Sequence, residues 1–223
     1  MSNESLARGL RPPVKATCKN PLLMKRFLKN LFEKFTGLQV LIEASGCSSV
    51  NLYCQDESRF GLLTVMRRMI TARGVKPVAP YLHRFDNLYL FGAFSPISGD
   101  YFLLEMPHCN SDTFQVFLNK FSEQTPNEFK VIILDNGAFH HAASLIIPKN
   151  IALIFLPPYS PELNPAERMW RHFKEKVSMV AYNSLELLQQ KISEITNNIN
   201  NTIVHSICSY DFYQKTFKTA FKL

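Results

Sequence analysis

An apolar run that passes through a proline-rich loop into a helix constrains this chain more than any other feature. Residues 151–156 predict a buried strand, and residues 156–170 read Leu-Pro-Pro-Tyr-Ser-Pro-Glu-Leu-Asn-Pro-Ala-Glu-Arg-Met-Trp. Asn164 is a good N-cap and Pro165 suits the first helical position, so Glu167 falls at the third. The carboxylate of Glu167 is therefore expected at a helix start close to the end of a strand.

Two further acids follow apolar runs. Asp56 comes after the run 50–55, and Asp135 comes after the run 131–134. The first of these strands and the strand ending at Asp135 are expected to be neighbours, with their C-terminal ends at the sheet rim where α/β folds place ligands. Each acid taken singly is as well explained as a turn former or a helix cap. Three carboxylates together predict a hard-cation site, and such sites usually act on phosphates.

Composition restricts the class of protein. With 46% hydrophobic and 19% charged residues over 223 positions, the chain is expected to form one domain with a real core and a small appendage. No apolar run approaches the roughly 18 residues of a membrane span, and no signal peptide is evident. Five scattered cysteines without a C-x-x-C motif favour free thiols. A soluble cytoplasmic protein, associated with the nucleoid if it binds DNA, is expected.

The positive charge is concentrated near the N-terminus. The net charge is +7, and residues 1–35 hold eight basic and two acidic side chains, a weak indication of a polyanionic partner. Residues 20–37 predict a helix whose apolar residues recur every fourth position, namely Leu23, Phe27, Leu31 and Phe35. Two interpretations stay open. The helix is either a connector packed on the body, which we favour, or a helix that contacts DNA.

The remaining pattern predicts a mixed sheet with helices on both faces. Strands are expected at 88–95 and 101–106, joined by a hairpin, and at 129–134. A helix from Ser111 carries an apolar stripe at Phe114, Phe117, Leu118 and Phe121. A helix is expected to about residue 177, and a last long one from Asn183 with Leu188, Ile192, Ile195 and Ile199 buried. Residues 60–80 predict an irregular hairpin that carries basic residues.

Three blocks of sequence point to one family. Residues 53–61, 134–140 and 156–170 closely resemble transposases of the bacterial insertion-sequence-630 branch of the mariner superfamily. The resemblance extends from about residue 50 to 180 and implies an RNase H-like α/β fold. It also implies that Asp56, Asp135 and Glu167 are the catalytic residues and the ligands of Mg²⁺, for which Mn²⁺ can substitute. Glu57 and Glu162 are acidic neighbours outside this set. The spacing from Asp135 to Glu167 is slightly shorter than is usual in the family.

Several polar side chains are candidates for DNA contact. Asn136 and His140 resemble family positions beside the second acid, where they orient phosphate or water or simply pack a turn. Arg171 and Lys174 follow Glu167 at i+4 and i+7, which favours phosphate contact over a solvated face. The predicted DNA-binding set is Asn136, His140, Arg171, Lys174, Arg73 and Lys76. Trp170 is expected in the core.

The family resemblance also indicates what is missing. Residues 1–48 are expected to form a basic arm and connector helix, and residues 49–223 the catalytic domain. Members of the family normally carry a longer helix-turn-helix region, so this chain is expected to be the catalytic half of a split element, a truncated copy or a fragment. A separately encoded helix-turn-helix protein is then a possible partner.

The expected activity is Mg²⁺-dependent cleavage of phosphodiester bonds at transposon ends, followed by joining of the 3′-hydroxyl to target DNA. The expected assembly is a homodimer on DNA, with no membrane association. Two alternatives stay open. One is an inactive transposase remnant that binds DNA or pairs with an intact copy as a regulator. The other is a nuclease of the same fold that acts on RNA–DNA hybrids or junctions.

Overall fold

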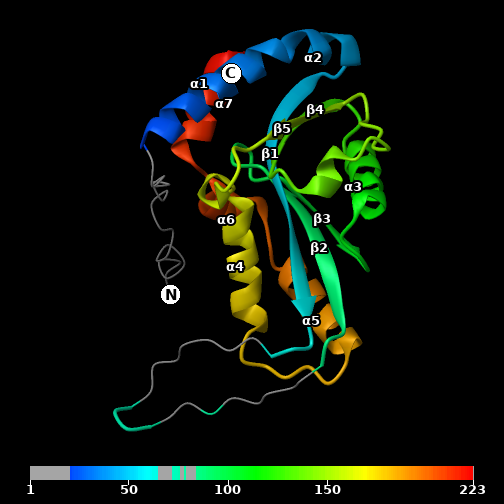
Figure 1. The fold of residues 1–223 in the computed structure, drawn as a ribbon, viewed down its shortest axis with the longest axis vertical. Coiled ribbons are helices and arrows are strands. Elements are labelled where there is room, and N and C mark those ends of the chain that lie inside the picture. Colours follow the sequence, from blue (N-terminus) through cyan, green and yellow to red (C-terminus); the bar gives the residue numbers. More distant parts are fainter. Residues whose placement is uncertain (1–20, 65–71, 76–77, 79–83, 223) are drawn as a thin grey trace, which may run out of the picture.

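The molecule is built on a mixed sheet of five strands (Figure 1). The computed structural model describes residues 21–64, 72–75, 78 and 84–222. The strands are β1 (Ser49–Gly61), β2 (Asn87–Phe94), β3 (Tyr101–Met106), β4 (Glu128–Leu134) and β5 (Ile151–Phe155). Their order is β3-β2-β1-β4-β5, with β1, β4 and β5 parallel and β2 antiparallel to its neighbours β1 and β3. The predicted mixed sheet is confirmed.

Helices cover both faces of this sheet, with α3 on one side and α4 on the other (Figure 1). The helices are α1 (Pro21–Gly37), α2 (Gln39–Ser45), α3 (Ser111–Gln124), α4 (Ala166–Val177), α5 (Leu185–Asn197), α6 (Asn201–Cys208) and α7 (Asp211–Phe221). Two 3₁₀ turns, η1 (Ala138–His141) and η2 (Pro161–Leu163), follow β4 and β5. Within the described ranges, no helix is long and apolar enough to cross a membrane.

Alternation along the central strands divides the core between the two faces. Tyr53, Ile132 and Leu134 pack with the predicted stripe of α3, all four members of which are buried. The intervening residues of β1 and β4 belong to the core on the opposite face, and they are Leu52, Cys54, Val131 and Ile133. β4 is buried from both sides, as its almost wholly apolar sequence predicts.

The first and last helices pack against each other. Phe27, Leu31 and Phe35 of α1 are buried in the same core as Tyr213 and Phe217 of α7. The rings of Phe35 and Phe217 meet edge to face at 5.6 Å. The inner face of α1 therefore behaves as a packed connector. The division into residues 1–48 and 49–223 stays a prediction.

Two predicted boundaries need correction at the site. β1 continues to Gly61 because its second half pairs antiparallel with β2, so Asp56 lies within the strand and not after it. α4 begins at Ala166, with Pro165 rather than Asn164 at the N-cap, which makes Glu167 its second residue.

Elsewhere, the expected long final helix ends at Asn197, and α6 and α7 follow it as separate helices. Asn200 accounts for the restart, because its side chain accepts from the N–H of Ile203 and caps α6. The four described cysteines, at 47, 54, 109 and 208, are free as predicted. Much of the predicted basic hairpin, including Arg67, Arg68 and Lys76, lies outside the described residues.

Gly92 allows α4 to approach the sheet closely. It lies in β2 opposite Asp56. A Cβ atom there would be 2.7 Å from ring atoms of both Phe94 and Trp170. Both rings are buried, so neither can move aside without disturbing the core. The absence of a side chain at Gly92 thus sets how near Trp170, and with it α4, comes to Asp56.

We expect Gly92→Ala to destabilise the protein by about 1–3 kcal/mol, because an added methyl group overpacks this contact. Its melting temperature should fall by roughly 2–4 °C per kcal/mol. Gly37→Ala is the matched control, since a Cβ atom there meets nothing within 4 Å. Scanning calorimetry checks the prediction, and equal melting temperatures for both variants would contradict it.

Candidate active site

The parallel register of β1 and β4 brings the first two predicted acids together. Cys54 pairs with Ile133 at the end of the parallel ladder. Asp56 and Asp135 each lie two residues further on, at the same level of strands that are about 4.8 Å apart. β1 continues beyond this point, whereas the chain leaves β4 and turns away. The two carboxylates therefore lie where the parallel part of the sheet ends.

A buried asparagine fixes the third acid relative to the first. The Asn164 side chain donates from Nδ2 to the carbonyl of Gln55 at 2.9 Å. Its Oδ1 accepts from the N–H of Ala166 at 3.1 Å. One side chain thus joins the residue before Asp56 to the residue before Glu167. A second hydrogen bond joins the loop before α4 to α7, because the Tyr213 hydroxyl donates to the Leu163 carbonyl at 2.8 Å.

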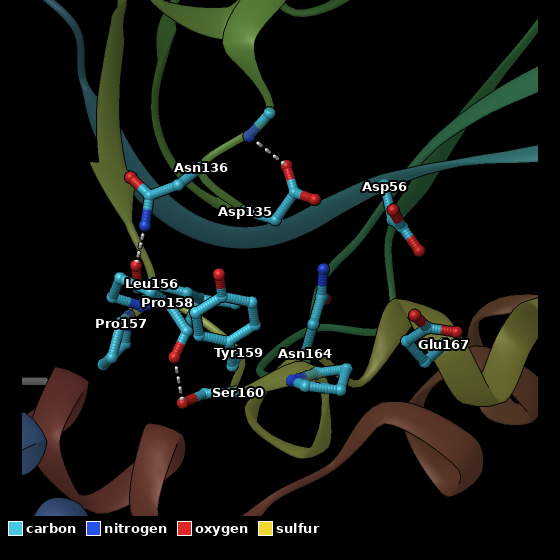
Figure 2. Close-up of a pocket in the computed structure, with 12 residues that line it drawn as sticks. Asp56, Asp135, Asn136, Leu156, Pro157, Pro158, Tyr159, Ser160, Asn164 and Glu167 are labelled. Atoms are coloured by element: carbon cyan, nitrogen blue, oxygen red, sulfur yellow. Dashed lines mark hydrogen bonds between the residues drawn. The ribbon is translucent and has the colours of Figure 1, made fainter.

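The three acids line one cleft of about 470 Å³. Figure 2 shows the carboxylates of Asp56 and Glu167 pointing toward each other, with Asp135 across the cleft. The remaining lining residues are Asn136, Gly137, Leu156, Pro157, Pro158, Tyr159, Ser160, Pro161 and Asn164. The neighbouring acids Glu57 and Glu162 do not line it. Among the described residues, no three His, Cys, Asp or Glu side chains are close enough to hold a metal ion as they stand.

The acids differ in their electrostatic environment. Burial, followed by the negative charges of Glu167 and Asp135, raises the pKa of Asp56 to about 7. The pKa of Asp135 is lowered, chiefly by a hydrogen bond from His140 and further by the N–H of Gly137. His140 Nε2 lies 3.2 Å from Asp135 Oδ1, and the Gly137 N–H donates to the same oxygen at 2.9 Å. Asp135 is therefore held ionised, while Asp56 is forced toward its neutral form.

His140 lies behind Asp135 and not in the cleft. Its side chain is 1% exposed and packs against the rings of Phe114 and Phe139 at 4.4 and 4.0 Å. Its Nε2 also faces the Glu57 carboxylate at 3.7 Å. Burial raises the pKa of Glu57 to about 8, although the Gln55 amide donates to it at 2.6 Å. This geometry favours orientation of Asp135 by His140 over direct contact with DNA.

The other predicted DNA-binding residues lie in different places. Asn136 lines the cleft, and its amide donates to the Leu156 carbonyl, which ties the end of β4 to the end of β5. Arg171 and Lys174 are exposed on α4 and do not line the cleft. Lys174 lines a separate small pocket with residues from the end of β1 and the C-terminal end of α4. Arg73 is exposed, and Lys76 lies outside the described residues.

Sequence reasoning missed one group at the site. Trp170 is buried in the core as predicted, but its indole N–H also lies near the Asp56 carboxylate and lowers the pKa of that group. The two do not complete a hydrogen bond of ordinary geometry, so the indole N–H has no partner. The signal was the i+3 spacing from Glu167, which places both side chains on one face of α4.

Comparison with known proteins identifies the family. The model of the family described as DDE superfamily endonuclease matches residues 51–189. The chain belongs to the DDE superfamily endonucleases. This membership confirms the prediction of an endonuclease, and the matched region contains Asp56, Asp135 and Glu167.

Known relatives of this DDE superfamily endonuclease include one curated protein and several solved structures. An uncharacterized protein, y4pE/y4sA of Sinorhizobium fredii (strain NBRC 101917 / NGR234), is 38% identical over 88 residues, which is 39% of this chain and 65% of that protein. The Mos1 mariner paired end complexes with Mn and with Mg match at TM-scores of 0.59 and 0.56 and identities of 15% and 16%. Each match covers 94% of this chain and 66% of the Mos1 chain. The chain thus spans less than two thirds of these relatives, and the Mos1 likeness shows a shared RNase H-like fold.

We expect Asp56→Asn to stabilise this DDE superfamily endonuclease in metal-free buffer above pH 7. The pKa of Asp56 rises from 3.8 to about 7 on folding. Well below pH 3.8 the group is neutral in both states and costs nothing, whereas above pH 7 the cost of burying its charge is present in full. The variant should therefore melt a few degrees higher at pH 8, on the order of 2–4 °C per kcal/mol.

Most of this gain should be lost near pH 4, and calorimetry at the two pH values with EDTA measures it. Glu43→Gln, which changes an exposed acid, is the control and should show no such pH-dependent difference. A gain that is the same at both pH values would contradict the assignment of the shift to Asp56.

Proposed function

We propose that this chain is the catalytic domain of a Mg²⁺-dependent DNA transposase of the bacterial insertion-sequence-630 branch. It would cleave phosphodiester bonds at transposon ends and join the freed 3′-hydroxyl to target DNA. The observation that carries the proposal is that Asp56, Asp135 and Glu167, far apart in sequence, line one cleft. Membership of the DDE superfamily endonucleases supports it.

The donor chemistry of the cleft fits a hard divalent cation. The three carboxylates and the side-chain carbonyls of Asn136 and Asn164 offer oxygen, and no thiol or imidazole is among the lining residues. Oxygen donors favour Mg²⁺ or Mn²⁺ over softer metals. Burial and, after it, repulsion by Glu167 and Asp135 raise the pKa of Asp56, and a bound cation would oppose both effects by stabilising the charged carboxylate. We propose Asp56, Asp135 and Glu167 as the ligands, and the Mos1 complexes with Mn and Mg support this choice.

The surrounding residues prepare these ligands. His140 and Gly137 hold Asp135 ionised and fix its orientation, so that it is ready to bind. Asp56 would release its proton on binding a cation, since charged carboxylate is the binding form. Asn164 holds the start of α4, and with it Glu167, close to β1. Divalent cations in such a site activate water or a 3′-hydroxyl and stabilise the leaving oxygen.

The proposed partners are DNA and other protein chains. The Mos1 chains of similar fold are in paired end complexes, which supports transposon ends and target DNA as substrates and a homodimer as the assembly. Residues 1–48 are proposed as arm and connector, residues 49–223 as catalytic domain, and a separate helix-turn-helix protein as a source of end recognition. Arg171, Lys174, Arg73, Lys76 and Asn136 are proposed to contact DNA, and His140 to act through Asp135.

We expect the purified protein to nick plasmid DNA that carries the genomic flanks of its coding sequence, in the presence of Mg²⁺ or Mn²⁺. Asp135→Asn should lower the nicking rate by about a thousandfold or more, because a metal site contributes several kcal/mol of transition-state stabilisation. Gel assays of supercoiled, nicked and linear DNA measure the rate. Circular dichroism verifies that the variant is folded.

Glu162→Gln is the matched control, since this acid lies in η2 between the cleft residues Pro161 and Asn164 but does not line the cleft. It should nick at the wild-type rate. Equal nicking by Asp135→Asn would refute the role of Asp135. DNA binding without any metal-dependent cutting would instead favour the inactive regulator, and preferential cutting of RNA–DNA hybrids or junctions would favour the alternative nuclease.

A further inference from the structure

A second groove lies along α1, next to the acidic cleft. It has a volume of about 360 Å³ and runs between α1 and the end of β5. Leu156, Pro157 and Pro158 line both the groove and the cleft, so the two hollows share one wall. Figure 2 shows both prolines at the edge of the cleft away from Glu167. The groove therefore lies next to the cleft, on the other side of the segment 156–158.

One wall of the groove is basic. Arg26, Asn30 and Lys34 are exposed, and they lie four residues apart on one side of α1. The other lining residues are Phe27, Leu31, Ile154, Phe155, Leu156, Pro157 and Pro158, and none of them is acidic. Within the described part of the chain, neither Arg26 nor Lys34 has an acidic partner, whereas Lys29 on the same helix lies 4.0 Å from Glu33. The groove thus presents two uncompensated positive charges.

The spacing of these charges suits a nucleic-acid backbone. Arg26 and Lys34 are two helical turns apart, about 12 Å along the axis. That distance corresponds to roughly three steps of a DNA strand at 3.4 Å per step. Asn30 lies between them, where its amide can donate to a phosphate oxygen. The buried stripe of α1 holds the helix that carries these side chains against the body, because Phe27, Leu31 and Phe35 are in the core.

We propose that this groove binds the sugar–phosphate backbone of the DNA strand that leaves the acidic cleft. The proposal rests on the proposed function, and it assigns to α1 a second role beside packing. Arg26 and Lys34 contact phosphates, and Asn30 contacts a phosphate that lies between theirs. The contacts carry no sequence information and set the position of the scissile phosphate relative to Asp56, Asp135 and Glu167.

The test compares two double variants of one helix. Arg26→Ala/Lys34→Ala removes the charges that line the groove. Lys25→Ala/Lys29→Ala removes two exposed charges of α1 that do not line the groove. Both double variants therefore have the same net charge. Both are made in the Asp135→Asn background, so that binding is measured without cutting. Fluorescence anisotropy gives Kd for a labelled duplex of the genomic flank at several salt concentrations.

We expect the groove variant to bind severalfold more weakly and to lower the slope of log Kd against log salt by about 2, one per lost phosphate contact. The control variant should keep the slope. Equal losses in both variants, or no loss in either, would overturn the proposal. If wild-type protein cuts DNA while the groove variant binds normally, only the groove proposal fails. If wild-type protein neither binds nor cuts, the proposed function fails as well.

Tyr159 carries a second, independent inference. Its backbone has φ of 56°, a left-handed conformation that disfavours bulky side chains, yet the residue is fully exposed at the rim of the cleft. A conformation of this kind costs roughly 1–2 kcal/mol. No ring contact within the described structure holds the side chain, and Figure 2 shows it among the residues that line the cleft. The left-handed backbone of Tyr159 therefore leaves its ring exposed to solvent in the cleft that the three acids line.

We infer that Tyr159 stacks on the base next to the scissile phosphate, which again rests on the proposed function. Stacking on an aromatic side chain contributes about 1–3 kcal/mol per base and tolerates any sequence. With 2-aminopurine beside the cleavage position, the Asp135→Asn protein should quench its fluorescence. Adding Tyr159→Phe should preserve quenching, and adding Tyr159→Ala should abolish it.

Tyr159→Gly separates stacking from structure, because glycine tolerates this backbone and should raise the melting temperature while losing the quench. Unchanged quenching in the Ala and Gly variants would overturn the inference even if the wild type cuts DNA. A wild type that fails to cut or bind would overturn the proposed function with it.

Discussion

The parallel pairing of β1 with β4 is the constraint on which the rest of the site depends. Its register places Asp56 and Asp135 at one level of adjacent strands, and every other feature of the cleft is arranged around that pair. Glu167 faces Asp56 because Asn164 joins α4 to β1. Burying Asp56 beside two other carboxylates raises its pKa and destabilises the folded protein when Asp56 is ionised. Such a loss of stability is common at functional sites.

Much of the fold could be predicted because its elements are locally consistent. β3, β4, β5 and α3 have clear periodicity and end at recognisable turn residues, so their positions were found within a residue or two. β1 was predicted too short, since its second half is held by β2, a partner that local sequence does not reveal. The final helix was predicted too long, because its apolar pattern continues past the end of α5 at Asn197. The side chain of Asn200 caps a new helix, α6, just after this end.

The acids of the site could be predicted from the sequence, whereas the neighbouring residues that shift their pKa values could be predicted only in part. The three motif acids were named from sequence, and all three line the cleft. Glu57 is adjacent to Asp56, and the alternation of side chains along β1 directs it toward His140 instead. The burial of His140 and the proximity of Trp170 depend on packing between elements distant in sequence. Such contacts leave no local signal that a single sequence can show.

The hydroxyl of Tyr213 gives the C-terminal helix an influence on the loop that carries Glu167. A stop codon that removed α7 would leave every acid of the motif encoded. It would, however, remove the hydrogen bond to the Leu163 carbonyl and expose the core around Phe35. The presence of all three acids in a sequence is therefore not enough to indicate that the loop carrying Glu167 is held in place.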